Sequence, residues 1–141
     1  MSEETPIEPW ASAQAPGIEA IEAIAAHAFG ELPVEFRALC DGLIIRVFDF
    51  PEEETLRAME AQSEFELLGL FQGRGLAHRG ARAETGEFPN MIWLYRRPLL
   101  DFWCEGSETL GAVISHVLVH EIGHHFGLSD EDMEAIEAGA Q

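Results

Sequence analysis

The sequence predicts one α+β domain, because strand-like and helix-like patterns alternate along a chain of 141 residues. Two apolar runs, 43–50 (LIIRVFDF) and 91–95 (MIWLY), are rich in β-branched and aromatic residues and predict strands. Hydrophobic residues make up 47% of the chain, enough for a buried core without disulfides. We expect residues 18–141 to form the domain, and the proline-containing residues 1–17 to be a poorly ordered lead-in.

Helices are predicted where apolar residues recur at three- and four-residue spacing. The first runs from 18 to 29, with Gly30 in the position of a C-terminal cap. Pro33 opens a short second helix that ends near residue 39. A third begins after Pro51, and its first turn carries three glutamates that suit the positive end of the helix dipole.

The C-terminal third is predicted to hold the longest helix, over 108–126, between a cap at Ser107 and Gly127. An acidic helix follows over 130–138, and we expect its run of carboxylates to be a solvated face. The glycine-rich segment 69–90 predicts a long loop that contains a short strand near 68–71.

The charge balance excludes several classes of partner. The net charge is -18, from 26 acidic residues against 8 basic ones, all of which are arginine. Phosphate backbones and anionic membrane surfaces repel such a chain, so we expect neither nucleic acid nor membrane as a partner. The chain has neither a secretory signal pattern nor an apolar run long enough for a membrane helix, which predicts a cytoplasmic protein. Cys40 and Cys104 lack metal or redox spacing and are expected to be buried, reduced thiols.

The segment HEIGH at 120–124 carries the strongest chemical signal. His120 and His124 are four residues apart on a predicted helix, so both imidazoles can reach one metal ion. Glu121 is rotated about 100° from His120 and can stand beside a metal-bound water without displacing a ligand. Two histidines and a third ligand, with one open position, make a catalytic zinc site.

Asp130 is the candidate for the third ligand. Gly127 permits a positive φ directly after the helix, and this turns the chain back toward the metal. The alternative is that Asp130 caps the last helix. Ser129 can serve as that cap instead, with Asp132 as its capping-box partner, which leaves Asp130 available to bind zinc.

This site predicts hydrolysis assisted by Zn²⁺. Zinc lowers the pKa of its water and polarises the scissile carbonyl, and Glu121 accepts the water proton and passes it to the leaving amine. A peptide or protein substrate would add as an extended strand to a free sheet edge. We expect segment 91–95 to be that edge, because it precedes the histidine helix and Pro98 limits its pairing.

Other candidate residues have structural alternatives. His116 lies one turn before His120 and either orients a ligand or is a hydrogen-bonded core histidine, which we favour. Tyr95 either donates to an oxyanion or packs in the sheet, and packing is the favoured interpretation. His125 points away from the metal-binding face and is expected to be structural.

The segment HEIGHHFGLSD at 120–130 resembles the small bacterial zincin-like metallopeptidases, which carry HExxHxxGxxD. The segments 32–36 (LPVEF), 68–73 (LGLFQG) and 94–100 (LYRRPLL) extend the resemblance over roughly 30–137. It implies a minimal zincin fold, in which a small mixed or antiparallel sheet packs on the active-site helix. It also implies that His120, His124 and Asp130 bind zinc and that Glu121 is the catalytic base.

Two functions remain open from the sequence. The favoured one is a zinc-dependent metallopeptidase, because a purely structural zinc site has no need of a carboxylate at Glu121. The alternative is a non-catalytic module that is stabilised by zinc and binds a peptide or protein at its sheet edge.

Overall fold

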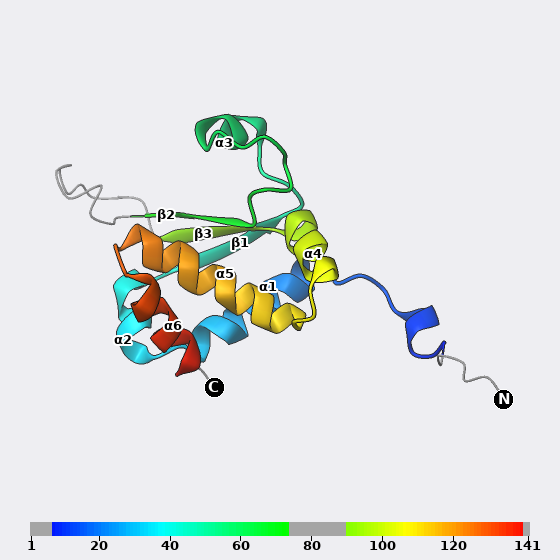
Figure 1. The fold of residues 1–141 in the computed structure, drawn as a ribbon, viewed down its shortest axis with the longest axis horizontal. Coiled ribbons are helices and arrows are strands. Elements are labelled where there is room, and N and C mark those ends of the chain that lie inside the picture. The colour runs from blue at the N-terminus through cyan, green and yellow to red at the C-terminus, as the bar shows by residue number, and fades with distance from the viewer. Residues whose placement is uncertain (1–6, 74–89, 140–141) are drawn as a thin grey trace.

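The computed structural model describes residues 7–73 and 90–139, which form several helices and a small mixed sheet (Figure 1). The predicted α+β class is confirmed. In chain order, the elements are η1 (Trp10–Ser12), α1 (Ile18–Gly30), α2 (Val34–Arg37), η2 (Ala38–Cys40), β1 (Ile44–Phe48), α3 (Glu53–Ala58), β2 (Gly69–Gln72), β3 (Met91–Tyr95), α4 (Arg96–Glu105), α5 (Leu110–His125) and α6 (Asp130–Ala138). The central part of the predicted loop 69–90 and its His78 lie outside the described residues.

The three described strands form one sheet in the order β1-β3-β2. β1 runs parallel to β3, with Ile44 opposite Met91, and β2 runs antiparallel to β3, with Gly69 opposite Leu94. The prediction that 91–95 is a free edge is therefore wrong, because β3 is the central strand. Its neighbours are β1 on one edge and β2 on the other.

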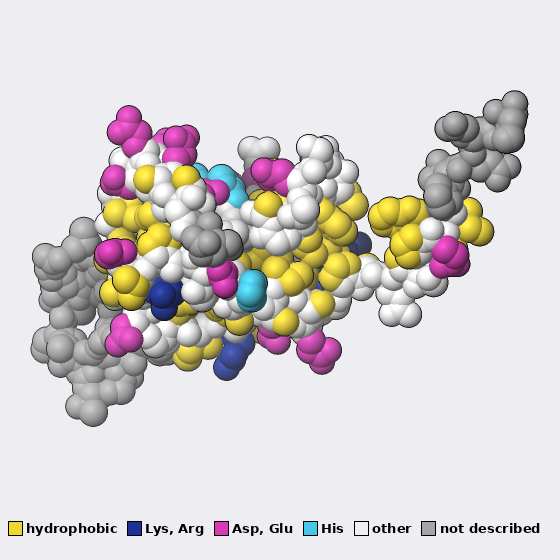
Figure 2. Space-filling view, turned by 90° about the horizontal axis from the view of Figure 1, so that it is seen from below, with side chains coloured by type: hydrophobic (Ala, Val, Ile, Leu, Met, Phe, Trp, Pro, Cys, Tyr) yellow, Lys and Arg dark blue, Asp and Glu magenta, His cyan; other side chains and the backbone are white. Residues whose placement is uncertain are grey.

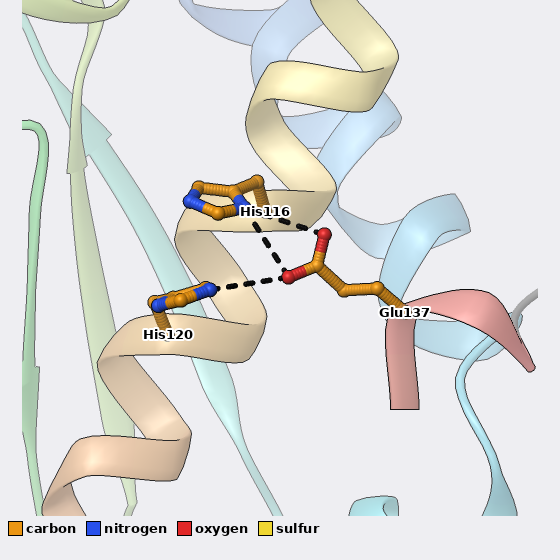
Figure 3. A group of neighbouring side chains, drawn as sticks. All are labelled: His116, His120 and Glu137. Atoms are coloured by element: carbon orange, nitrogen blue, oxygen red, sulfur yellow. Dashed lines mark hydrogen bonds and ion pairs between the residues drawn. The ribbon is translucent and has the colours of Figure 1, made fainter. Parts of the chain in front are cut away.

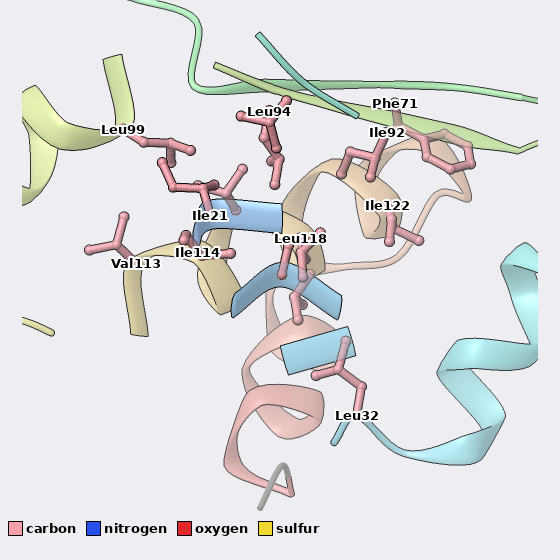
Figure 4. Packing of buried hydrophobic residues seen from close by; sticks show 14 of the residues in the cluster. Ile21, Leu32, Phe71, Ile92, Leu94, Leu99, Val113, Ile114, Leu118 and Ile122 are labelled. Atoms are coloured by element: carbon pink, nitrogen blue, oxygen red, sulfur yellow. The ribbon is translucent and has the colours of Figure 1, made fainter. Parts of the chain in front are cut away.

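One face of the sheet packs against α1 and α5, and the core lies between these layers (Figures 1 and 4). Ile92 and Leu94 of β3 point from the sheet toward the helices and are fully buried. Ile21 of α1 and Leu118 of α5 meet them from below and are also fully buried. Burying these aliphatic side chains removes apolar surface from water, and this fixes α5 beneath the sheet.

Helix α4 was not expected from the sequence, where Pro98 was interpreted as a residue that limits pairing of the strand 91–95. Pro98 is the third residue of α4, where the backbone N–H has no helical partner, so proline is accommodated there and does not limit strand pairing. Arg96, in the first turn of α4, forms hydrogen bonds with two segments that are distant in sequence. It donates to the Pro16 carbonyl at 2.6 Å and pairs with Asp49 at 3.0 Å.

Helix α5 begins at Leu110, and its cap is Thr109 rather than the predicted Ser107. The N–H of Ala112 donates to Thr109 Oγ1 at 3.1 Å, which satisfies one of the free donors of the first turn. Both threonine and serine can cap, so residue type alone does not distinguish Thr109 from the predicted Ser107. The buried residue Leu110 follows Thr109 directly, and the helix starts at its first core contact.

Helix α5 ends in a turn that brings α6 back against it. Gly127 has a φ of +79°, as predicted, and the N–H of Leu128 donates to the Gly123 carbonyl at 2.8 Å. Met133 of α6 is fully buried and packs over Gly123 of α5. This turn and this contact set the distance between the two helices.

The two cysteines differ in their surroundings. Cys40 is buried, and burial raises the pKa of its thiol to about 11. Cys104 is exposed on α4, so the prediction of a buried pair is wrong for this residue. Both are free thiols.

The N-terminal lead-in has few contacts with the domain. Residues 7–15 are exposed and carry η1, and they extend away from the body of the molecule (Figure 1). Residues 1–6 of the predicted lead-in lie outside the described part of the chain. None of the described helices is long and apolar enough to cross a membrane.

We predict that Gly123→Ala destabilises the fold, because a Cβ at this position would lie 2.5 Å from the sulfur of the buried Met133. Overpacking of this kind costs about 1–3 kcal/mol, and the better helix propensity of alanine returns only about 1 kcal/mol. Urea unfolding of the metal-free protein measures the difference. Gly111→Ala in the same helix is the control, because a Cβ there meets nothing within 4 Å. Equal stability of the two variants would contradict the close α5–α6 contact.

Candidate metal centre

Three histidines of α5 follow one another at four-residue intervals. His116 and His120 have ring centroids 3.9 Å apart, and His120 and His124 have centroids 5.7 Å apart. This spacing places the three rings one turn apart along the same side of the helix. The expected position of His116 one turn before His120 is confirmed.

A carboxylate from α6 faces two of these histidines (Figure 3). Glu137 Oε2 lies 3.2 Å from His116 Nδ1 and 3.2 Å from His120 Nε2. Its other oxygen, Oε1, lies 3.3 Å from His116 Nδ1. Glu137 therefore bridges two turns of α5 from the neighbouring helix.

These three residues stand out as a set of metal-ligand atoms. Among residues 7–73 and 90–139, His116, His120 and Glu137 are the one group of three such residues whose ligand atoms all lie within 4.8 Å of one another. Two imidazole nitrogens and one carboxylate oxygen are ligands that zinc accepts in catalytic sites. The residues present therefore fit a zinc ion.

The three predicted zinc ligands are only partly brought together. A surface cavity of about 370 Å³ is lined by His116, His120, Asp130, Glu134 and Glu137. It includes His120 and Asp130, whereas the exposed His124 is not among its lining residues. The ligand atoms of His120, His124 and Asp130 do not all lie within 4.8 Å of one another. Zinc binding by His120, His124 and Asp130 together therefore remains a prediction.

Asp130 is the first residue of α6 and is not its cap. Ser129 Oγ accepts from the N–H of Asp132 at 3.0 Å, and the N–H of Ser129 donates to the Asp132 carboxylate at 3.4 Å. The predicted capping box is therefore confirmed. Asp130 is exposed, and within the described part of the chain no hydrogen bond or ion pair engages its side chain.

Glu121 is half-buried on α5, beside His120. Burial raises the pKa of its carboxyl to about 7, because the ionised form loses solvation there. Tyr95, at the end of β3, is buried, and its pKa is raised to about 12 by burial and then by the charges of Glu52 and Glu121. Tyr95 therefore keeps its proton at neutral pH, and Glu121 is near enough to influence it.

The other two histidines of α5 considered above, His125 and His116, lie in different surroundings. His125 packs edge-on against Phe71, with ring centroids 4.4 Å apart, which confirms its structural placement. His116 is exposed beside Glu137, so the favoured interpretation as a core histidine is wrong. The histidine lies on the outer side of α5, where α6 crosses.

Glu137 was not expected to be a ligand, because the acidic C-terminal run was predicted to be a solvated face. Asp130, Glu134 and Glu137 recur at spacings of four and three residues, which places them on one side of α6. This periodicity was a usable signal, but only α6 docking on α5 shows that the acidic side meets the histidines. In Figure 2, histidine lies beside acidic side chains on a surface with few basic residues.

A long helix that carries HExxH beneath a small mixed sheet is the arrangement of a minimal zincin. A family model of zincin-like metallopeptidases matches residues 40–140 and covers both α5 and α6. The chain belongs to this zincin-like metallopeptidase family. A search of curated proteins found no match.

We predict that Asp130 contributes little to folding, because Ser129 caps α6 without it. In the metal-free protein, Ser129→Ala should lower the free energy of unfolding by about 1 kcal/mol, whereas Asp130→Asn should change it by less than about 0.5 kcal/mol. Chemical unfolding in the presence of a chelator measures both. A larger loss for Asp130→Asn than for Ser129→Ala would assign Asp130 a structural role.

Proposed function

We propose that this protein is a zinc-dependent hydrolase of peptide bonds, with His120, His124 and Asp130 as metal ligands and Glu121 as the general base. The main support for this proposal is the arrangement of side chains around α5. Its two HExxH histidines lie one turn apart on the same side of the helix, and the turn at Gly127 brings Asp130 to the cavity that His120 lines. Membership of the zincin-like family supports this assignment.

The ligand set requires only surface side chains to move. His124 and Asp130 are exposed, so rotation of their side chains toward His120 leaves the core undisturbed. His120 Nε2 must be released from Glu137, which lies 3.2 Å away. The backbone that carries the ligands is fixed by the packing of Met133 and by the Ser129 cap.

Zinc, when bound, supplies a Lewis acid that acidifies water and polarises a carbonyl. Glu121 then has the proton-transfer role. Burial raises the pKa of its carboxyl to about 7 in the metal-free protein. A carboxylate at this position is the group that can accept a proton from water and later donate it to a leaving amine. Glu121 follows His120 directly on α5 and is half-buried.

We propose the free edge of β2 as the binding surface for an extended peptide. β2 is an outer strand of the described sheet, is hydrogen-bonded to β3 on its inner side and packs against α5. An added strand would pair with backbone groups of β2 and run past the helix that carries Glu121. This edge replaces 91–95, which the sequence had suggested.

We predict that Glu121→Gln lowers the rate of peptide hydrolysis by about 10²–10⁴-fold, because the amide cannot accept a proton. Zinc content, measured by mass spectrometry of the purified protein, should stay near that of the wild type. Hydrolysis is followed with a fluorogenic peptide library between pH 5 and 9. Glu108→Gln, an exposed change outside α5, is the matched control and should retain full activity.

Two outcomes would overturn this proposal. If the wild type carries zinc, cleaves no peptide across this pH range and unfolds when chelated, the zinc-stabilised binding module is the correct function. If Glu121→Gln cleaves as fast as the wild type, Glu121 is not the base.

A further inference from the structure

We propose that His116, His120 and Glu137 form a second zinc position, separate from the HExxH ligand set and sharing only His120 with it. It is built across two helices, with His116 and His120 on α5 and Glu137 on α6 (Figure 3). The inference rests on the geometry of these three side chains and is independent of peptidase activity.

The distances suit a small metal ion. Zinc binds imidazole nitrogen and carboxylate oxygen at about 2.0–2.2 Å, and tetrahedral angles then place neighbouring ligand atoms about 3.3–3.5 Å apart. Glu137 Oε2 lies 3.2 Å from His116 Nδ1 and 3.2 Å from His120 Nε2. These two separations need to change by only a few tenths of an ångström to bind zinc. The ligand nitrogens of His116 and His120 lie within 4.8 Å of each other and must reach a similar separation.

The charge of the surroundings favours a cation. Glu137, Asp130 and Glu134 line one cavity together with the two histidines. Three carboxylates against two imidazoles leave this cavity with a negative charge when the histidines are neutral, and a divalent ion compensates that charge. An ion pair with protonated histidine is the competing explanation, and it predicts no zinc affinity.

The fold also holds Glu137 opposite the two histidines before any metal binds. Met133 is buried against Gly123, and the capping box of Ser129 fixes the start of α6. The helix from Asp130 to Ala138 then carries Glu137 to its place opposite His116. Ligands that are held by rigid elements lose little freedom when the metal binds.

Sharing His120 makes the two positions mutually exclusive when each uses Nε2 of that ring. Zinc held by His116 and Glu137 leaves His124 and Asp130 without metal. We therefore expect one zinc per chain, distributed between the two positions according to their affinities.

The test is zinc binding to the double variant His124→Ala/Asp130→Ala, which lacks the ligands unique to the HExxH set. The apparent Kd is measured by competition with a chromophoric chelator at pH 7.5. We expect one zinc per chain, with a rise in melting temperature because the ion links α5 to α6. Both deleted side chains are exposed, and circular dichroism of the metal-free variant checks the fold.

Adding Glu137→Gln to this double variant should weaken zinc binding by more than the roughly 10–100-fold that follows loss of an outer-sphere partner. The matched control adds Glu131→Gln instead, which removes the same charge from an exposed residue of α6. This control should bind zinc within about threefold of the double variant. Absence of zinc from the double variant, or equal effects of the two glutamine changes, would overturn the second position.

The variant His116→Ala/Glu137→Gln separates this inference from the proposed function. It lacks the ligands unique to the second position and should bind one zinc through the HExxH set and cleave peptides. If it binds zinc but cleaves nothing, the proposed function fails while the second position stands. If it binds no zinc and the first double variant still does, the second position is the zinc site of this protein.

Discussion

The docking of α6 against α5 is the constraint on which the candidate metal centre depends. Gly127, with its φ of +79°, reverses the chain after the histidine helix, and Met133 then packs against Gly123, which has no side chain to hold the helices apart. The acidic side of α6 consequently faces the histidine side of α5. A helix with the same sequence docked elsewhere would leave the acidic side of α6 in solvent and would leave His116 and His120 without the Glu137 carboxylate. One backbone turn and one close contact therefore assemble most of the groups that can bind metal.

His120 is the residue on which the two ligand arrangements converge. Its Nε2 atom faces Glu137 at 3.2 Å, while its position in HExxH assigns it to a site with His124 and Asp130. Both arrangements contain two imidazoles and one carboxylate, so zinc chemistry alone does not distinguish them. The proposed base, Glu121, belongs to the HExxH segment, so the proposed hydrolysis assigns the metal to His120, His124 and Asp130. The position at Glu137 is proposed for metal binding alone, without an assigned proton acceptor.

Local signals predicted much of the fold. The strand 91–95, the helix 130–138, the positive φ at Gly127 and the Ser129 capping box all depend on residues that are near one another in sequence. Contacts between distant segments were the source of the errors. Strand order decides that β3 is central and β2 is an outer strand, and no pattern within MIWLY records which strands pair with it. Glu137 became a candidate ligand only when α6 was placed on α5. Helix α4 was missed because Pro98, read as a strand terminator, fits the first turn of a helix equally well.

The most direct test of a zinc centre at His120 is a crystal structure of the zinc-loaded wild-type protein, with anomalous diffraction recorded at the zinc absorption edge. We expect an anomalous peak about 2.0–2.1 Å from a ring nitrogen of His120. The remaining ligands should come from either His124 and Asp130 or His116 and Glu137. A fully loaded crystal in which zinc lies elsewhere, with His120 still paired only to Glu137, would contradict this expectation.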